Sequence, residues 1–287
     1  MRFGLSLFTC DRGITPAEAA RAAEERGLDS FYVPEHTHIP ISRETAHPAT
    51  GDETLPDDRY RRTLDPWVAL ATAASVTTTI RLGTSVSLPA EHDPIALAKT
   101  IATLDHLSGG RVQLGVGFGW NLEEMADHGV PIARRRAYLA DTLAAMQALW
   151  SQDEAAYEGE FVRFGPSWAW PKPVQQPRPP VLVGAFGNAK AFDWIVRHAD
   201  GWITTPLDEG VGELAALLRD KWAEAGRAGE PQVIALETTA GERLDEFAAA
   251  GVTEVLVGLP DADRDGALRH LDQLVARIDE HKGAVTA

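Results

Sequence analysis

A glutamate and a histidine stand next to each other where a short apolar stretch ends. Ser30–Pro34 reads SFYVP, which predicts a buried strand, and Glu35 and His36 follow it directly. A histidine can give or take a proton near neutral pH, with a neighbouring carboxylate in support. A structural histidine that is only hydrogen-bonded explains the same position equally well. Glu35 and His36 are therefore candidate catalytic residues.

A second candidate region is the glycine-rich stretch Gly110–Glu124, which reads GRVQLGVGFGWNLEE. Its alternating Val and Leu predict a strand, and the glycines in its second half leave the main chain open to a ligand. The same glycines could simply relieve packing. Trp120 and Asn121 follow at once and offer an indole face and an amide to a flat ligand.

The third candidate is the turn Gly184–Asn188 (GAFGN), which opens a predicted helix. Free N–H groups at a helix start can hold a phosphate. An ordinary N-cap at Asn188 is the alternative, and the sequence leaves both open.

The sequence lacks the motifs of several other classes of enzyme and binding site. The sequence has neither the G-x-S-x-G elbow of serine hydrolases nor a phosphate-binding P-loop. His36 and His38 have a spacing that could suit a metal, but no third ligand is evident, so we expect no metal site. Nothing near Cys10 marks it as an activated nucleophile.

Short apolar strands alternate with helical patterns along the whole chain. The predicted strands are Phe3–Phe8, Ser30–Pro34, Ile80–Leu88, the glycine-rich stretch, Pro180–Gly184, Gly201–Thr205, Gln232–Leu236 and Glu254–Gly258. Strands that alternate with helices form parallel sheets, and eight such units predict a (β/α)8 barrel. The rival is a doubly wound open sheet, but Thr9–Gly13 lacks the usual G-x-G-x-x-G turn.

A barrel would gather the candidate residues at one end, because its active site lies at the carboxyl ends of the strands. We expect one domain over residues 1–287, with an insertion after the second strand at residues 38–62. We also expect an excursion before the fifth strand, where the weakly alternating residues 157–164 lead into a proline- and tryptophan-rich run at 165–180. The insertion is rich in proline and charge and could serve as a lid.

The chain of 287 residues is acidic, with a formal net charge of −15 and a pI near 5.0. This charge argues against nucleic acid or an anionic membrane as the main partner. Cys10 is the single cysteine, which predicts a reducing compartment. No apolar run approaches the length of a membrane span. We expect a cytoplasmic enzyme that acts on a small molecule.

The sequence resembles the luciferase-like monooxygenase family, especially its actinobacterial branch of oxidoreductases that depend on coenzyme F420. The matching segments lie in order between Phe31 and Trp202: FYVPEHTHIP, TLDPWVALATAASVTTTIRLGTSVSLP, HDPIALAKTIATLDHLSGGRVQLGVGFGWNLEE, ALW with GEFVRF, WPKPVQQPRPPVLVGA and ADGW. The resemblance implies a bacterial-luciferase-like (β/α)8 barrel, in agreement with the strand pattern, and a homodimer.

The resemblance also implies roles for single residues. A bulge that backs the deazaflavin ring, often with a non-prolyl cis peptide bond, matches the end of the third strand, and we expect that bond between Ser85 and Val86. The matching cofactor-binding positions are Thr84, Ser85 and Val86 at the bulge, Trp120, Asn121 and Glu123 after the fourth strand, and Gly184, Ala185 and Asn188 at the phosphate-binding turn.

Two departures separate this sequence from related sugar-phosphate dehydrogenases. In those relatives the histidine matching His36 is the proposed base and its neighbour is Asp rather than Glu35. The position of Trp120 is an acid there, so a different substrate or reaction is implied. The last third of the chain shows no cluster of Lys and Arg for a substrate phosphate.

The implied reaction is hydride transfer between coenzyme F420 and a small organic substrate. The first alternative is an FMN-dependent monooxygenase on the same fold, which would use reduced flavin and O2. The second is a barrel that binds a flavin or another ligand without catalysis.

Overall fold

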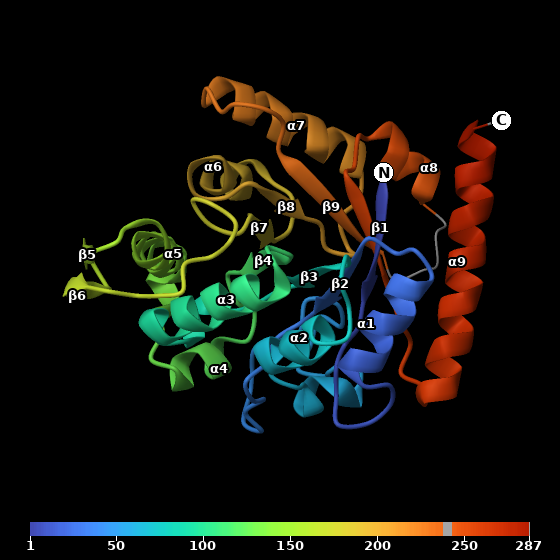
Figure 1. Cartoon of the computed structure of the whole chain (residues 1–287), viewed down its shortest axis with the longest axis horizontal. Coiled ribbons are helices and arrows are strands. Elements are labelled where there is room, and N and C mark those ends of the chain that lie inside the picture. The colour runs from blue at the N-terminus through green and yellow to red at the C-terminus, as the bar shows by residue number, and fades with distance from the viewer. Residues whose placement is uncertain (238–242, 287) are drawn as a thin grey trace.

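The computed structural model describes residues 1–237 and 243–286 (Figure 1). Within them, eight parallel strands close into a barrel in the order β1-β10-β9-β8-β7-β4-β3-β2. These strands are β1 Arg2–Ser6, β2 Ser30–Val33, β3 Arg81–Thr84, β4 Val112–Gly117, β7 Val181–Gly184, β8 Gly201–Ile203, β9 Gln232–Glu237 and β10 Glu254–Gly258. Thr238, which we expected at the end of the seventh barrel strand, lies outside the described residues.

The barrel is closed by β1, which pairs with strands on both of its edges. Gly4 lies opposite Leu256 of β10 and opposite Ser30 of β2, and both pairings are parallel. The predicted (β/α)8 barrel is therefore confirmed, and the open doubly wound sheet is excluded. The candidate residues at the carboxyl ends of the strands accordingly lie around one mouth.

A helix follows each barrel strand and packs outside it. These helices are α1 Pro16–Glu25, α2 Pro66–Ala74, α3 Pro94–Ser108, α5 Arg135–Ser151, α6 Ala189–His198, α7 Val211–Glu224, α8 Leu244–Ala249 and α9 Arg264–Thr286. Four of them open on a side chain that accepts a backbone N–H, namely Thr15, Asp65, Asp93 and Asn188. These caps fix where each connecting segment ends and its helix begins.

Side chains fill the barrel, so its centre is a core and not a channel. Tyr32, Leu182, Ile203, Ile234 and Leu256 form the inner cluster, each at most 1% exposed. A larger apolar cluster lies between the strands and the helices. A ligand can therefore bind only at an end of the barrel.

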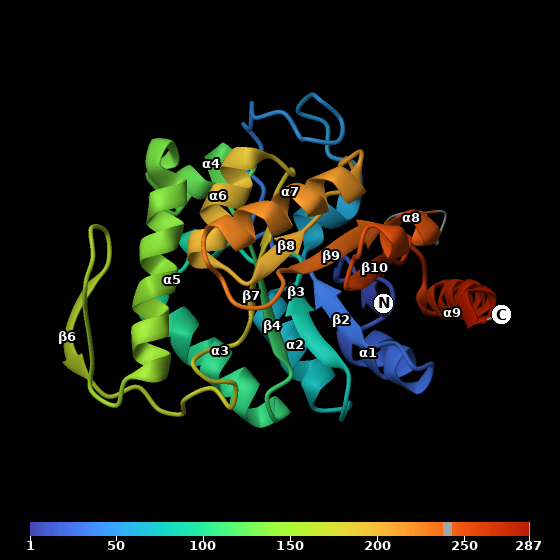
Figure 2. The same ribbon diagram turned by 90° about the horizontal axis from the view of Figure 1, so that it is seen from above.

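The remaining helices and strands lie in the segments that connect the barrel strands with the outer helices. They are the helix α4 Leu122–Asp127, the short 3-10 helices η1 Asp58–Arg62, η2 Pro89–Glu91 and η3 Ile132–Arg134, and the antiparallel hairpin β5 Ala155–Glu158 with β6 Arg163–Ser167. In Figure 1 the hairpin and α9 lie on opposite sides of the molecule. Figure 2 shows the predicted insertion between β2 and α2 reaching beyond the barrel. None of the helices in the described part is long and apolar enough to span a membrane.

Candidate active site

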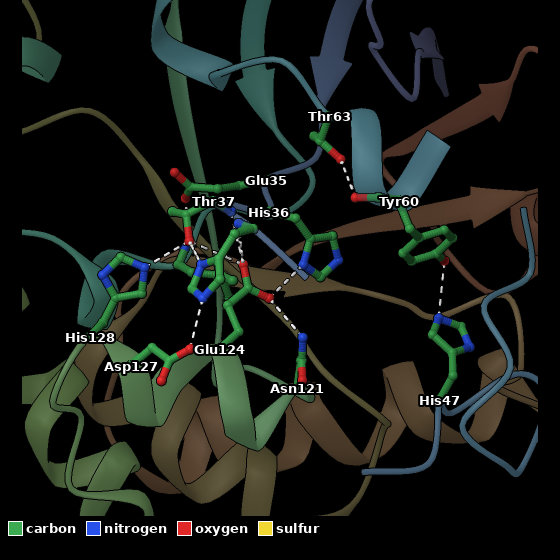
Figure 3. A network of polar contacts seen from close by, with 12 residues as sticks. Glu35, His36, Thr37, His47, Tyr60, Thr63, Asn121, Glu124, Asp127 and His128 are labelled. Carbon is green, nitrogen blue, oxygen red and sulfur yellow. Dashed lines mark hydrogen bonds and ion pairs between the residues drawn. The ribbon is translucent and has the colours of Figure 1, made fainter. Parts of the chain in front are cut away.

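His36 and a buried glutamate, Glu124, form an ion-pair contact at the end of β2. Nδ1 of His36 lies 2.8 Å from Oε2 of Glu124, and their side chains are 7% and 0% exposed. Glu124 belongs to α4, so the pair connects the ends of β2 and β4 (Figure 3). With Nδ1 held in this way, Nε2 of His36 is the ring nitrogen without a hydrogen-bond partner among the described residues.

Glu124 is held as a carboxylate by several donors. Its Oε1 accepts the backbone N–H of Thr37 at 2.8 Å, and its Oε2 accepts the amide of Asn121 at 3.2 Å. Burial alone would raise the pKa of Glu124, but the bonds from His36 and Thr37 outweigh it and lower the pKa. The carboxylate therefore fixes the orientation of the His36 ring.

Glu124 was not among the predicted site residues, although its neighbour Glu123 was. The helical period of α4 could have identified it, because Glu124 stands three residues after Asn121 and so shares its face. Glu123 points instead to the insertion.

Two aromatic rings pack near the His36 ring. The Trp120 ring lies 5.6 Å from the His36 ring, and the Tyr60 ring lies 5.5 Å from it. His47 packs on Trp120 at 4.7 Å and accepts or donates a hydrogen bond at Tyr60 Oη, 3.0 Å away. Tyr60 also packs on Phe8 at the end of β1. These rings form a largely apolar wall beside His36.

Residues 38–62 are ordered and contact this wall. Oε1 of Glu123 accepts the backbone N–H groups of Glu44 and Thr45 at 2.8 and 3.0 Å. Although burial opposes ionisation, the bonds from Thr45 and Glu44 lower the pKa of Glu123 to about 2. The Arg43 guanidinium lies 5.3 Å from the Trp120 ring. The insertion is thus anchored to the end of β4.

Glu35 has a different environment from His36. Its Oε2 accepts Ser87 Oγ–H at 2.7 Å and the Leu88 N–H at 2.6 Å, and its Oε1 lies 2.7 Å from His92 Nε2. The side chain therefore holds the segment after β3. The structure does not bring the carboxylate of Glu35 onto the His36 ring.

The peptide bond between Ser85 and Val86 is cis, as expected. Thr84, the last residue of β3, donates its hydroxyl to the Gly115 carbonyl at 2.7 Å. Val86 is half-buried between the ends of β4 and β7. A Cβ on Gly117 would lie 2.6 Å from Val86 Cγ2, and one on Gly184 would overlap Val86 Cγ1.

These contacts support one of the two interpretations of the glycine-rich stretch. Gly115 makes room for the Thr84 carbonyl, Gly117 for Val86, and Gly119, at φ +76°, for Met125. The glycines therefore serve packing within the barrel mouth, and the approach of a ligand to their main chain stays a prediction.

Asn121 offers the mouth a polar group without a partner. The residue is 2% exposed, and its Oδ1 has no hydrogen-bond partner among the described residues. A buried orphan acceptor favours a ligand that brings an N–H donor. This observation fits the pyrimidine edge of a deazaflavin or flavin.

The turn after β7 offers fewer free N–H groups than expected. Asn188 caps α6, with Oδ1 accepting the Ala191 N–H at 3.0 Å. The Gly187 N–H already donates to Asp208 Oδ1 at 2.9 Å. The structure thus shows the ordinary cap at Asn188.

Arg136 provides a cation near the end of β4. The sequence predicts a solvated helix surface at Arg134, Arg135 and Arg136, and Arg134 does pair with exposed Glu160. Arg136, however, lies 4.5 Å from the ring of Phe118, which follows β4, and its buried Nη1 has no partner among the described residues. Such a group favours an anion.

Glu91 of η2 is a second buried acid near the pair. It is 7% exposed, and neither carboxyl oxygen has a hydrogen-bond partner in the described part of the chain. Burial, with Glu124 and Glu35 nearby, raises the pKa of Glu91 to about 9. The group is therefore neutral at physiological pH. Among the described residues, no three His, Cys, Asp or Glu side chains converge as metal ligands do.

Comparisons with known proteins show the family of this chain. A model of the luciferase-like monooxygenase family matches residues 1–285. An uncharacterized protein of Mycobacterium tuberculosis is 62% identical over 279 residues, covering 97% of this chain and 99% of that protein. An F420-dependent glucose-6-phosphate dehydrogenase of Nakamurella multipartita is 31% identical over 262 residues, covering 88% of this chain and 66% of that protein.

Solved structures show the same fold at lower identity. A coenzyme F420 dependent tetrahydromethanopterin reductase of Methanopyrus kandleri superposes with a TM-score of 0.68 at 18% identity, covering 93% of this chain and 96% of that one.

Proposed function

The chain belongs to the luciferase-like monooxygenase family, and on that premise we propose that it is an oxidoreductase that uses coenzyme F420. The reaction is hydride transfer between this cofactor and a small organic substrate. When bound, the cofactor supplies a deazaflavin carbon that gives or takes a hydride and reacts poorly with oxygen. The protein positions the reactants and handles the accompanying proton.

The arrangement of His36 is the observation that carries this proposal. Its Nδ1 is held by Glu124, while Nε2 has no partner among the described residues, and the ring lies near those of Trp120 and Tyr60. A ring fixed at one nitrogen and free at the other suits proton transfer to or from a substrate oxygen. Glu35 acts in this proposal as a positioning residue, since its carboxylate holds Ser87 and His92.

The mouth of the barrel has groups that suit the cofactor ring. Thr84, Ser85 and Val86, at the cis bond, would form its backing, and the unpartnered Oδ1 of Asn121 would accept a ring N–H. Trp120 would cover the ring, and Glu123 would hold the insertion that keeps water out.

The cofactor phosphate would bind between the turn after β7 and a cation. Gly184, Ala185 and Asn188 are the residues of the turn that we propose for this role. Because the Gly187 N–H is already bonded to Asp208, we add Arg136, whose Nη1 is buried without a partner in the described part of the chain. We also propose a cytoplasmic homodimer, on the basis of the family resemblance.

A titration of the protein with coenzyme F420 and with FMN tests the proposal. Tryptophan fluorescence should be quenched by F420 at lower concentrations than by FMN, and Trp120→Phe should reduce the amplitude of quenching. Trp168→Phe, which replaces an exposed tryptophan of the excursion, is the matched control and should leave it unchanged. Preference for FMN would favour the monooxygenase, and binding of neither would favour the barrel without catalysis.

A further inference from the structure

A continuous series of polar contacts leads from His36 to the protein surface (Figure 3). Nδ1 of His36 lies 2.8 Å from Glu124 Oε2. The other oxygen, Oε1, accepts the hydroxyl of Thr37 at 3.3 Å, and Thr37 Oγ1 lies 2.7 Å from His128 Nε2. Each contact is within hydrogen-bond reach.

The environment changes along this series from dry to solvated. The side chain of Glu124 is fully buried, whereas Thr37 and His128 are both exposed. A second branch leaves Thr37 through His38, whose Nδ1 lies 3.0 Å from Thr37 Oγ1 and whose Nε2 lies 3.0 Å from Asp127 Oδ2. Glu124 is therefore the buried link between His36 and groups that contact water.

Given the function proposed above, we propose that Glu124, Thr37 and His128 form a proton relay between His36 and bulk solvent, with His38 as its parallel branch. When Nε2 of His36 gains a proton in the active site, the Nδ1–H bond breaks and the proton passes to Glu124. The carboxyl group of Glu124 then turns so that this proton faces Thr37, and the Thr37 hydroxyl turns from Glu124 Oε1 to His128 Nε2. Thr37 takes the proton from Glu124 as it releases its own to His128, which gives a proton to water. One proton moves outward, no electron moves, and the reverse sequence delivers a proton.

The lowered pKa of Glu124 means that it holds the passing proton only briefly, and the groups beyond it can take that proton up. Burial and the charge of His38 lower the pKa of His128, so its ring is neutral at physiological pH and can accept a proton. Glu91 adds no charge because its pKa is raised to about 9. The other titratable groups packed around the pair are Glu35, His92, His47, Arg43, Tyr60 and Asp127.

Hydrogen exchange at His36 measures the relay without any cofactor or substrate. The rate at which the Nδ1 proton of His36 exchanges with water can be followed by NMR on protein with 15N-labelled histidine. Thr37→Val keeps the shape of the side chain but removes the hydroxyl, and Thr37→Ser keeps the hydroxyl. Thr50→Val, on the exposed part of the insertion, is the matched control.

The relay predicts that Thr37→Val slows this exchange at least about tenfold while the Nδ1 chemical shift stays that of a ring bonded to Glu124. Thr37→Ser and Thr50→Val should exchange as the wild type does. If Thr37→Val does not fold, the double variant His38→Phe/His128→Phe replaces it, since both positions are exposed. Its Nδ1 exchange should also be at least about tenfold slower than that of the wild type. A smaller change, or a Thr37→Ser rate as slow as that of Thr37→Val, overturns the relay. Because the measurement needs no cofactor, its result is separate from that of the titration with F420 and FMN.

Discussion

Nε2 of His92 lies 2.7 Å from Oε1 of Glu35, and the side chain of Glu35 is almost completely buried. Burial lowers the pKa of His92, but the hydrogen bond and the charge of Glu35 outweigh it and raise that pKa above the ordinary 6.5. This pair joins the end of β2 to the segment that follows β3. It therefore couples the stability of the barrel mouth to pH.

Replacement of His92 by Gln should cost more stability in mild acid than in alkali. A histidine with a raised pKa contributes its full stabilisation below its unfolded value and loses it as pH rises through its folded value. Thermal unfolding of both proteins at about pH 5.5 and about pH 9 measures the difference. A larger gap at alkaline pH would contradict the assigned pair.

Glu91→Gln should stabilise the protein near neutral pH. The carboxyl has a pKa of about 9 in the folded protein and an ordinary value of 4.5, so stability is lost as pH rises between them. A neutral amide avoids that loss, with an expected gain on the order of 2–3 kcal/mol near pH 7 and almost none near pH 4. Chemical denaturation at both pH values measures it. Glu158→Gln, at an exposed glutamate, is the control, and an equal gain there would refute the explanation.

Gly117→Ala should destabilise the barrel mouth because of Val86. The new Cβ would lie 2.6 Å from Val86 Cγ2, and overpacking of this kind costs about 1–3 kcal/mol. The cost should mostly disappear when Val86→Ala is already present, as a double-mutant cycle would show. Gly165→Ala is the matched control, since its Cβ meets nothing within 4 Å. Equal costs with and without Val86 would rule out this contact.

Glu123→Gln should loosen the insertion without unfolding the barrel. The carboxylate accepts the N–H groups of Glu44 and Thr45, and its lowered pKa means that this contribution is present above about pH 4.5 and is lost as pH falls towards 2. Limited proteolysis within residues 38–62 should become faster near neutral pH, while the global melting temperature changes little. An unchanged cleavage rate would show that the Glu123 contacts do not hold the insertion in place.

His36→Ala should reduce turnover by about 10²–10⁴-fold, the usual contribution of a general acid or base. Affinity for the cofactor should stay the same, because the proposed cofactor contacts come from other residues. His106→Ala, at an exposed position near the end of α3, is the control. Unchanged turnover with intact cofactor binding would remove His36 from the reaction.

The barrel could be predicted because its signal is repeated along the chain. Each strand is short and apolar and each is followed by a helix, so small errors at the ends did not alter the count: Ile80–Leu88 was predicted as one strand, whereas β3 ends at Thr84. The cis bond at Ser85–Val86 came from family resemblance and not from residue pattern.

The partners within the site could not be predicted in the same way. Glu124 meets His36 across 88 positions of sequence, and only the phase of a six-residue helix decides that Glu124 rather than Glu123 faces inward. The neutral state of Glu91 depends on burial and on two other acids, which no local pattern reveals. The hairpin β5–β6 was expected only as an excursion, because its alternation is weak.

Three successive residues, Glu35, His36 and Thr37, contact three different regions: the segment after β3, the barrel mouth and the surface beside α4. Deleting or inserting one residue here would move all three side chains to the wrong region at once. The length of the chain is therefore fixed between Val33 and His38. Changes in length can be accommodated further along the insertion, because residues there such as Ile41 are exposed to solvent. Relatives of this protein can thus vary what covers the mouth by gaining or losing residues there, while the histidine and its partners stay in register.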